Sequence, residues 1–104
     1  MITGWYDHCA TGPIDFFVHT RKYASEKQQQ NTHLIIGPWD HSVMGEAASE
    51  YDFGQDALLD NSSIEEAFFE THLKRNPSTE ALAPVRIIVM GKNKWRDETD
   101  WPLS

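Results

Sequence analysis

The chain has 104 residues, 39% of them hydrophobic, which suits one small globular domain at most. Nine Lys and Arg residues against sixteen Asp and Glu residues give a net charge of −7, which argues against a nucleic-acid partner. No apolar run approaches the roughly 18 residues of a membrane span, and no signal peptide is visible, so we expect a cytoplasmic protein without membrane contact. The single cysteine, Cys9, excludes an internal disulfide framework and a zinc cage of several thiolates.

The first quarter of the chain predicts a strand followed by a helix. The β-branched residues Ile2 and Thr3 indicate the end of a strand that runs into a loop. Pro13 fits the first position of a helix, and Asp15 would then lie in the first turn, where the helix dipole favours negative charge. Apolar residues at helical spacing follow, so we predict an amphipathic helix over residues 13–24.

A second strand follows a polar connector. Residues 28–31 are polar and are expected to form this connector. Residues 34–36 are apolar without alternation, which predicts a strand buried on both faces in a parallel sheet. Residues 39–60 are loop-like, with Gly45 and Gly54 as breakers.

A helix, a linker and a strand are expected in the remainder. Ser62 and Glu65 form a capping-box pattern at the start of a helix that Pro77 would end. Four apolar residues are expected to form its buried stripe: Ile64, Ala67, Phe68 and Leu73. A linker over residues 81–84 leads to a β run over residues 85–90, and the charged tail over residues 92–104 is expected to be rich in turns.

These elements predict an α/β fold that is incomplete by itself. Two parallel strands with their helices leave sheet edges and a helix face uncovered, whereas an average sheet has five or six strands. We therefore expect the chain to be a piece of a larger fold.

Two ionisable residues lie just beyond the ends of the first two strands. Asp7 follows the first strand, and His41 follows the second strand 34 residues later. Active sites of open α/β sheets form at this edge, and a carboxylate can orient and stabilise an imidazole that accepts a proton near pH 7. The order is that of the Ser, Asp and His residues of α/β-hydrolases without the first member. Taken alone, such a pair is more often made of ordinary surface or capping residues.

Several longer stretches resemble one family, in the order in which that family carries them. They are residues 3–7, residues 34–39 with 41–42, residues 52–54, residues 68–69 with 73–74, residues 84–91, and residues 93, 95–96 and 101–103. Together they resemble the C-terminal part of the hydrolase domain of the cocaine esterase / X-Pro dipeptidyl-peptidase (CocE/NonD) acyl hydrolases.

This resemblance implies the fold and the division of the chain. Residues 1–80 would be the C-terminal part of an α/β-hydrolase domain, contributing the last two strands of its parallel sheet with their flanking helices. Residues 81–104 would be a linker and the first strand of a C-terminal jelly-roll β-sandwich.

The resemblance also implies a serine hydrolase that cleaves an ester, an amide or an X-Pro peptide through an acyl-serine intermediate, without a cofactor. Asp7 would be the acid and His41 the base of the catalytic triad, while Cys9 and Trp39 would contact the substrate. His8 and Cys9 stand where cocaine-esterase-like members tend to have a glycine and an aromatic residue, so the resemblance implies an acyl pocket that is less aromatic than in those members. No Gly-x-Ser-x-Gly motif is present, so the 104 residues alone are predicted to be inactive.

Other interpretations stay open. The chain could be a catalytically inactive fragment or binding module, a homo-oligomer, or a subunit that completes a split hydrolase with a missing N-terminal half. A metal site made of His8, Cys9, His33 or His41 is disfavoured, because no zinc-ligand spacing is present. The four tryptophans could form a binding platform, although packing between loops is the simpler expectation.

Overall fold

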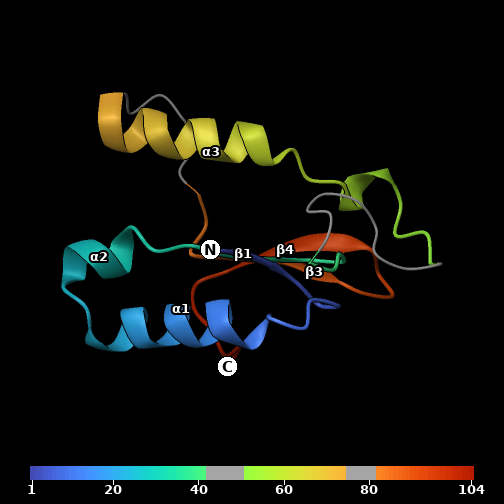
Figure 1. Cartoon of the computed structure of the whole chain (residues 1–104), viewed down its shortest axis with the longest axis horizontal. Coiled ribbons are helices and arrows are strands. Elements are labelled where there is room, and N and C mark those ends of the chain that lie inside the picture. Colours follow the sequence, from blue (N-terminus) through green and yellow to red (C-terminus); the bar gives the residue numbers. More distant parts are fainter. Residues whose placement is uncertain (42–50, 75–81) are drawn as a thin grey trace.

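A computed structural model describes residues 1–41, 51–74 and 82–104 of the chain. Within these residues the fold is built on one four-stranded sheet (Figure 1). The strands lie side by side in chain order: β1 (Ile2–Gly4), β2 (Leu34–Gly37), β3 (Val85–Val89) and β4 (Lys94–Glu98). The first three strands run parallel, and β4 is antiparallel to β3. The predicted α/β class is confirmed.

Strand β3 is hydrogen-bonded to β2 and therefore extends the same sheet as the first two strands. A division of the chain near residue 80, with a jelly-roll β-sandwich beginning in residues 81–104, stays a prediction, as does the assignment of the sheet to an α/β-hydrolase.

Helices α1 (Thr11–Tyr23) and α3 (Asn61–Phe69) lie on opposite sides of the sheet (Figure 1). Two clusters of buried apolar side chains form the core: a main core that combines Phe17 of α1 with four strand residues, and a second cluster of three residues. The main core consists of Phe17, Leu34, Ile36, Val85 and Ile87; the second cluster consists of Phe53, Ala57 and Ile88. Successive side chains of a strand point to opposite faces, so Ile87 and Ile88 reach different clusters. All four residues of β2 are buried, which confirms the predicted strand with two covered faces.

Helix α1 begins two residues earlier than predicted, at Thr11, so Pro13 occupies its third position. The first turn of a helix has no intrahelical partners for its N–H groups, and proline is therefore tolerated there as well as at the first position. The first turn contains no acidic residue, because Asp15 comes after it. The predicted apolar stripe is confirmed: Phe17 is fully buried and Ile14 packs against the same cluster.

The predicted polar connector contains a short helix, α2 (Glu26–Gln30). The side-chain oxygen of Gln28 accepts hydrogen bonds from the N–H of Ser25 at 3.3 Å and from its hydroxyl at 2.9 Å. These bonds hold the start of the helix, so a Ser-x-x-Gln capping pattern outweighs the absence of apolar residues. The prediction of a plain connector was wrong.

Helix α3 is capped by Asp60 and not by the predicted pair Ser62 and Glu65. The Asp60 carboxylate accepts a hydrogen bond from the N–H of Ser62 at 3.1 Å and a second from the hydroxyl of Ser63. A carboxylate before the first turn also interacts favourably with the helix dipole, which explains why the helix begins one residue before Ser62. The helix continues as a π-helical turn over Glu70–Lys74, whereas Pro77 and Gly45 lie outside the described residues.

The apolar stripe predicted for α3 is not buried in this structure. No residue of the helix is fully buried, and Leu73 is 74% exposed. Ile64 and Phe68 instead line a groove of about 450 Å³ together with Met1, which precedes β1, and Ile35 of β2. The prediction had the apolar positions right but their burial wrong, because an open groove lies between α3 and the sheet.

The tail predicted to be rich in turns contains β4. Gly91 and Asn93 adopt positive φ angles of 87° and 51°, and they turn the chain back onto β3. The Arg86 guanidinium then pairs with the Asp97 carboxylate across the two strands, at 2.6 and 2.8 Å. An edge strand needs only one hydrogen-bonded neighbour, so a polar sequence without apolar alternation can form one.

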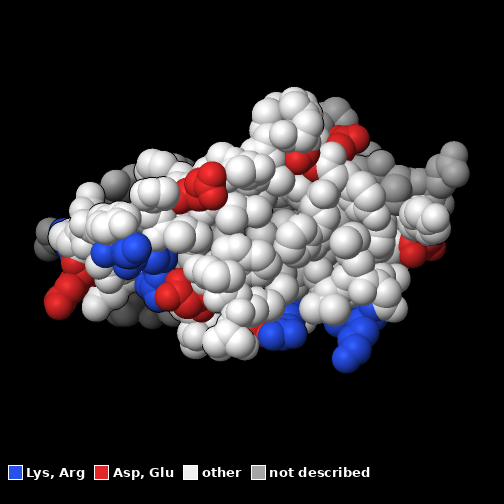
Figure 2. Space-filling model, turned by 90° about the horizontal axis from the view of Figure 1, so that it is seen from below, with Lys and Arg blue, Asp and Glu red and all other residues white. Residues whose placement is uncertain are grey.

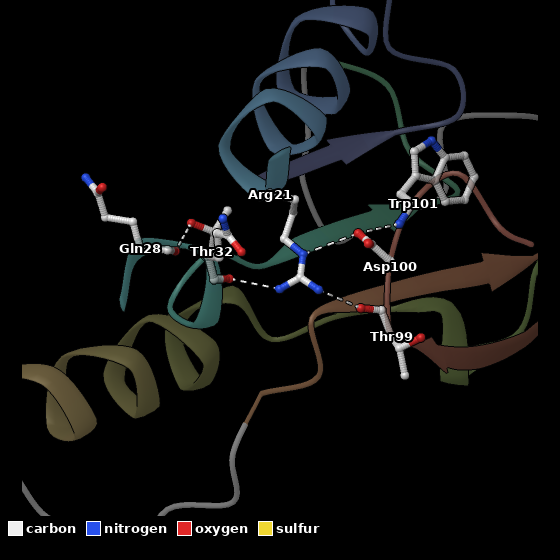
Figure 3. Close-up of polar contacts among 7 residues, drawn as sticks. Arg21, Gln28, Thr32, Thr99, Asp100 and Trp101 are labelled. Atoms are coloured by element: carbon white, nitrogen blue, oxygen red, sulfur yellow. Dashed lines mark hydrogen bonds and ion pairs between the residues drawn. The ribbon is translucent and has the colours of Figure 1, made fainter. Parts of the chain in front are cut away.

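Arg21 of α1 connects the helix with the C-terminal tail (Figure 3). Its guanidinium donates hydrogen bonds to the backbone carbonyls of Gln29 at 3.0 Å and Thr99 at 3.1 Å. It also donates to the Asp100 carboxylate at 3.2 Å. One side chain thereby joins α1 both to the neighbouring α2 and to the C-terminal tail, which is far away in the sequence.

Replacing Arg21 with Lys is expected to lower the free energy of unfolding by about 1–2 kcal/mol, because an ammonium cannot reach all three acceptors in the geometry of a guanidinium. Urea denaturation followed by tryptophan fluorescence measures the change. The exposed Lys27→Gln substitution serves as a control and should change stability by less than about 0.5 kcal/mol. An equal effect of the two substitutions would contradict the role of Arg21.

Figure 2 shows the molecule from the side on which α1 lies in Figure 1. Basic groups on this face lie in separate small patches, one of them directly beside acidic groups, so its described residues form no continuous basic surface. None of the helices among the described residues has both the length and the apolar character needed to cross a membrane.

Candidate active site

The loops after β1 and β2 meet at the carboxyl edge of the sheet. The two strands are paired in parallel, with Gly4 opposite Gly37. Two further backbone hydrogen bonds continue the contact beyond the strands, from Trp5 N–H to the Gly37 carbonyl at 2.9 Å and from Tyr6 N–H to the Trp39 carbonyl at 3.3 Å. This pairing places Asp7 and His41 on neighbouring loops.

The side chains of Asp7 and His41 are in hydrogen-bonding contact. Nδ1 of His41 lies 3.1 Å from Oδ1 of Asp7. The Asp7 side chain is 10% exposed and the His41 side chain 62% exposed. The sequence predicted that these two residues lie together, and the structure brings them together; their catalytic roles stay a prediction.

The carboxylate of Asp7 is held by two further donors. The backbone N–H of Cys9 donates to Oδ1 at 2.7 Å, and the Thr3 hydroxyl donates to Oδ2 at 3.3 Å. The hydrogen bond from Cys9 is the main cause that lowers the pKa of Asp7 below its usual value, with further contributions from His41 and Thr3 that oppose the effect of burial. Asp7 is therefore an oriented anion at neutral pH.

An oriented carboxylate fixes the state of the imidazole beside it. When Nδ1 of His41 donates its proton to Asp7, Nε2 is the unprotonated nitrogen of the neutral ring. Nε2 can then accept a proton from a third group, and the anion stabilises the imidazolium that results. The arrangement can thus perform general base and then general acid chemistry.

The two predicted substrate contacts have different positions. Cys9 is exposed and adjoins the Asp7 carboxylate through its backbone. Trp39 is fully buried, with its ring 6.0 Å from that of Trp95. The predicted contact between Trp39 and a substrate therefore has no support in the structure, because no part of the Trp39 ring is accessible.

The tryptophans pack in pairs in this structure. Trp5 and Trp101 have ring centroids 6.0 Å apart, and the Trp5 indole N–H donates to the Ile88 carbonyl at 3.1 Å. Trp95 donates to the Asp56 carbonyl. This is the expected packing between loops and the sheet.

Thr3 is the polar residue of the site that the sequence did not single out. It is buried, with 2% of its surface exposed, and its hydroxyl contacts the carboxylate. A threonine in a strand is explained by its β propensity alone, so nothing in the sequence indicated that its hydroxyl contacts the Asp7 carboxylate.

The structure also brings together three side chains with metal-ligating atoms. One ligand atom from each of Asp7, Cys9 and His41 lies within 4.8 Å of the other two. His33, by contrast, precedes β2 and contacts the Ala83 carbonyl through Nδ1 at 3.0 Å. The sequence disfavoured a metal site among these residues because no zinc-ligand spacing is present, and that criterion does not apply to ligands that come from two separate loops.

A carboxylate and an imidazole paired at the carboxyl edge of adjoining parallel strands form an acid–base site of the kind that α/β proteins place there. The chain is 35% identical over 107 residues to cocaine esterase from Rhodococcus sp. (strain MB1 Bresler). The match covers 99% of this chain but only 18% of that protein. The chain is therefore related to the CocE/NonD family of hydrolases over a segment that is a small part of its relative. No protein-family model matches the chain.

Proposed function

We propose that this chain supplies the acid and the base of a Ser-His-Asp triad in an acyl hydrolase, with Asp7 as the acid and His41 as the base. The contact of 3.1 Å between Nδ1 of His41 and Oδ1 of Asp7 carries this proposal. The relationship to cocaine esterase supports it, because it points to the hydrolysis of a small ester. Related amides and X-Pro peptides are the other substrates that the proposed chemistry allows.

In the proposed reaction, Nε2 of His41 accepts the proton of a serine hydroxyl that comes from outside the 104 residues. The serine oxygen attacks the carbonyl carbon of the substrate, and the bond to the leaving group breaks as His41 returns the proton to it. Water then attacks the acyl-serine with the same assistance and releases the acid. Asp7 stabilises the imidazolium in both steps without taking up the proton.

The test is a chimera in which this chain replaces the matching segment of cocaine esterase. We expect the chimera to hydrolyse a chromogenic ester and to react with a serine-directed fluorophosphonate, whereas the same protein without the segment should do neither. The 104-residue chain alone should not be labelled. A folded chimera, as judged by circular dichroism, that hydrolyses no ester would contradict the proposal.

A further inference from the structure

Asp7, Cys9 and His41 contribute three different ligand types to one small region of the surface. A carboxylate oxygen, a thiol sulfur and a ring nitrogen come within 4.8 Å of one another. Oxygen, sulfur and nitrogen are the three donor types that proteins use to bind Zn²⁺. Two of the three residues are exposed, so an ion can reach them from solvent.

The loop after β1 brings two of these ligands side by side. Because the Cys9 N–H donates to Oδ1 of Asp7 at 2.7 Å, the turn over residues 7–9 places the cysteine beside the carboxylate. Thr3 holds the other carboxylate oxygen from within the sheet. Asp7 and Cys9 are thus arranged before any ion binds, and His41 approaches from the neighbouring loop at 3.1 Å.

The distances are close to those of a tetrahedral site. Zn–S bonds of about 2.3 Å and Zn–N bonds of about 2.0 Å separate ligand atoms by roughly 3.2–3.8 Å in a tetrahedron. Exposed side chains such as Cys9 and His41 can close the remaining gap of roughly 1 Å by small rotations about their χ angles. Three protein ligands leave the fourth position to water, or to the exposed His8, whose Nδ1 lies 4.0 Å from Oδ1 of Asp7.

We propose that Asp7, Cys9 and His41 form a binding site for Zn²⁺ or a similar divalent ion at the carboxyl edge of the sheet. The Cys9 thiol loses its proton to solvent as its sulfur coordinates the metal. Binding of the ion does not depend on the proposed hydrolase function. It does engage both residues of the acid–base pair, so an occupied site excludes their action on a serine.

The test is metal titration of the full 104-residue chain. Co²⁺ serves as a spectroscopic probe, and Zn²⁺ affinity is measured by competition with a chromophoric chelator. We expect intense visible bands of tetrahedral Co²⁺ and a thiolate-to-cobalt charge-transfer band in the near ultraviolet. Cys9→Ser should abolish the charge-transfer band, and Cys9→Ser and His41→Gln should each lower Zn²⁺ affinity at least about tenfold.

His19→Gln is the matched control, because it removes an exposed histidine on α1 and should leave the affinity unchanged. Near-ultraviolet circular dichroism reports on the fold of every variant, and Cys9 is exposed, so its hydroxyl replacement should not disturb packing. The proposed site would be overturned if Cys9→Ser left the Zn²⁺ affinity unchanged, or if His19→Gln lowered it as much as Cys9→Ser does.

The chimera separates this inference from the proposed function. Zn²⁺ should inhibit its ester hydrolysis, and Cys9→Ser should make the inhibition at least about tenfold weaker. Metal binding by the chain together with an inactive chimera would contradict only the triad. An active chimera together with a chain that shows no cysteine-dependent binding would contradict only the metal site.

Discussion

His41→Ala in the cocaine esterase chimera is expected to lower kcat by about 10⁶-fold, which is the size of loss seen when the base of a serine-protease triad is removed. Among the described residues, the other imidazole near Asp7 is that of His8, and its Nδ1 lies 4.0 Å from Oδ1, beyond hydrogen-bonding distance, so no oriented base replaces His41. The loss should fall on kcat rather than on KM, because the side chain acts in the transition state. Steady-state kinetics with a chromogenic ester measures it.

Asp7→Asn provides the graded comparison for this prediction. An amide keeps the shape of the carboxylate but removes the charge that stabilises the imidazolium, and kcat should fall by about 10⁴-fold. His33→Gln is the control, since His33 lies before β2 and contacts only the Ala83 carbonyl among the hydrogen bonds described for its ring. A folded His41→Ala chimera with near-normal turnover would exclude His41 as the base.

The sequence was most informative where burial decides the structure. The apolar run of β2 and the stripe around Phe17 were predictable because their side chains have no alternative to the core. Asp7 and His41 were predictable as neighbours for a related reason. Once two strands are parallel and adjacent, the residues just beyond their carboxyl ends share one edge of the sheet.

The sequence was least informative where hydrogen bonds decide the structure. Helix α2 depends on the Gln28 side chain, and β4 depends on backbone pairing with β3, so neither needs an apolar pattern. The same holds within the site. The contacts of Thr3 and the Cys9 N–H with Asp7 follow from the path of one loop, and the residue types alone do not specify that path.

The apolar side of α3 shows a third reason for a wrong expectation. Its apolar positions were predicted correctly, yet Phe68 is 37% exposed and Leu73 is 74% exposed. Periodicity predicts which side of a helix is apolar but not what covers it. The 104 residues leave this side and the outer edge of β1 without a covering element among the described residues, which is consistent with a match to 18% of a longer relative.

Gly4→Ala is expected to cause the largest loss of stability of any single methyl addition in the sheet, about 3 kcal/mol or more. A Cβ built on Gly4 lies 1.8 Å from the backbone oxygen of Trp39 and 2.6 Å from its carbonyl carbon. Backbone atoms cannot rotate away as a side chain can. The loop that carries Asp7 would have to separate from the loop that carries His41.

Gly12→Ala is the matched control, because a Cβ there meets nothing within 4 Å and Gly12 lies in α1. Alanine in a helix should stabilise the protein by up to about 1 kcal/mol, so the two substitutions should have effects of opposite sign. Thermal and urea denaturation of both variants measure the difference. In the chimera, Gly4→Ala should also lower kcat, since the contact between Asp7 and His41 depends on the close approach of the two loops. A Gly4→Ala protein that unfolds at the same urea concentration as the parent would show that the loops do not approach as closely as described.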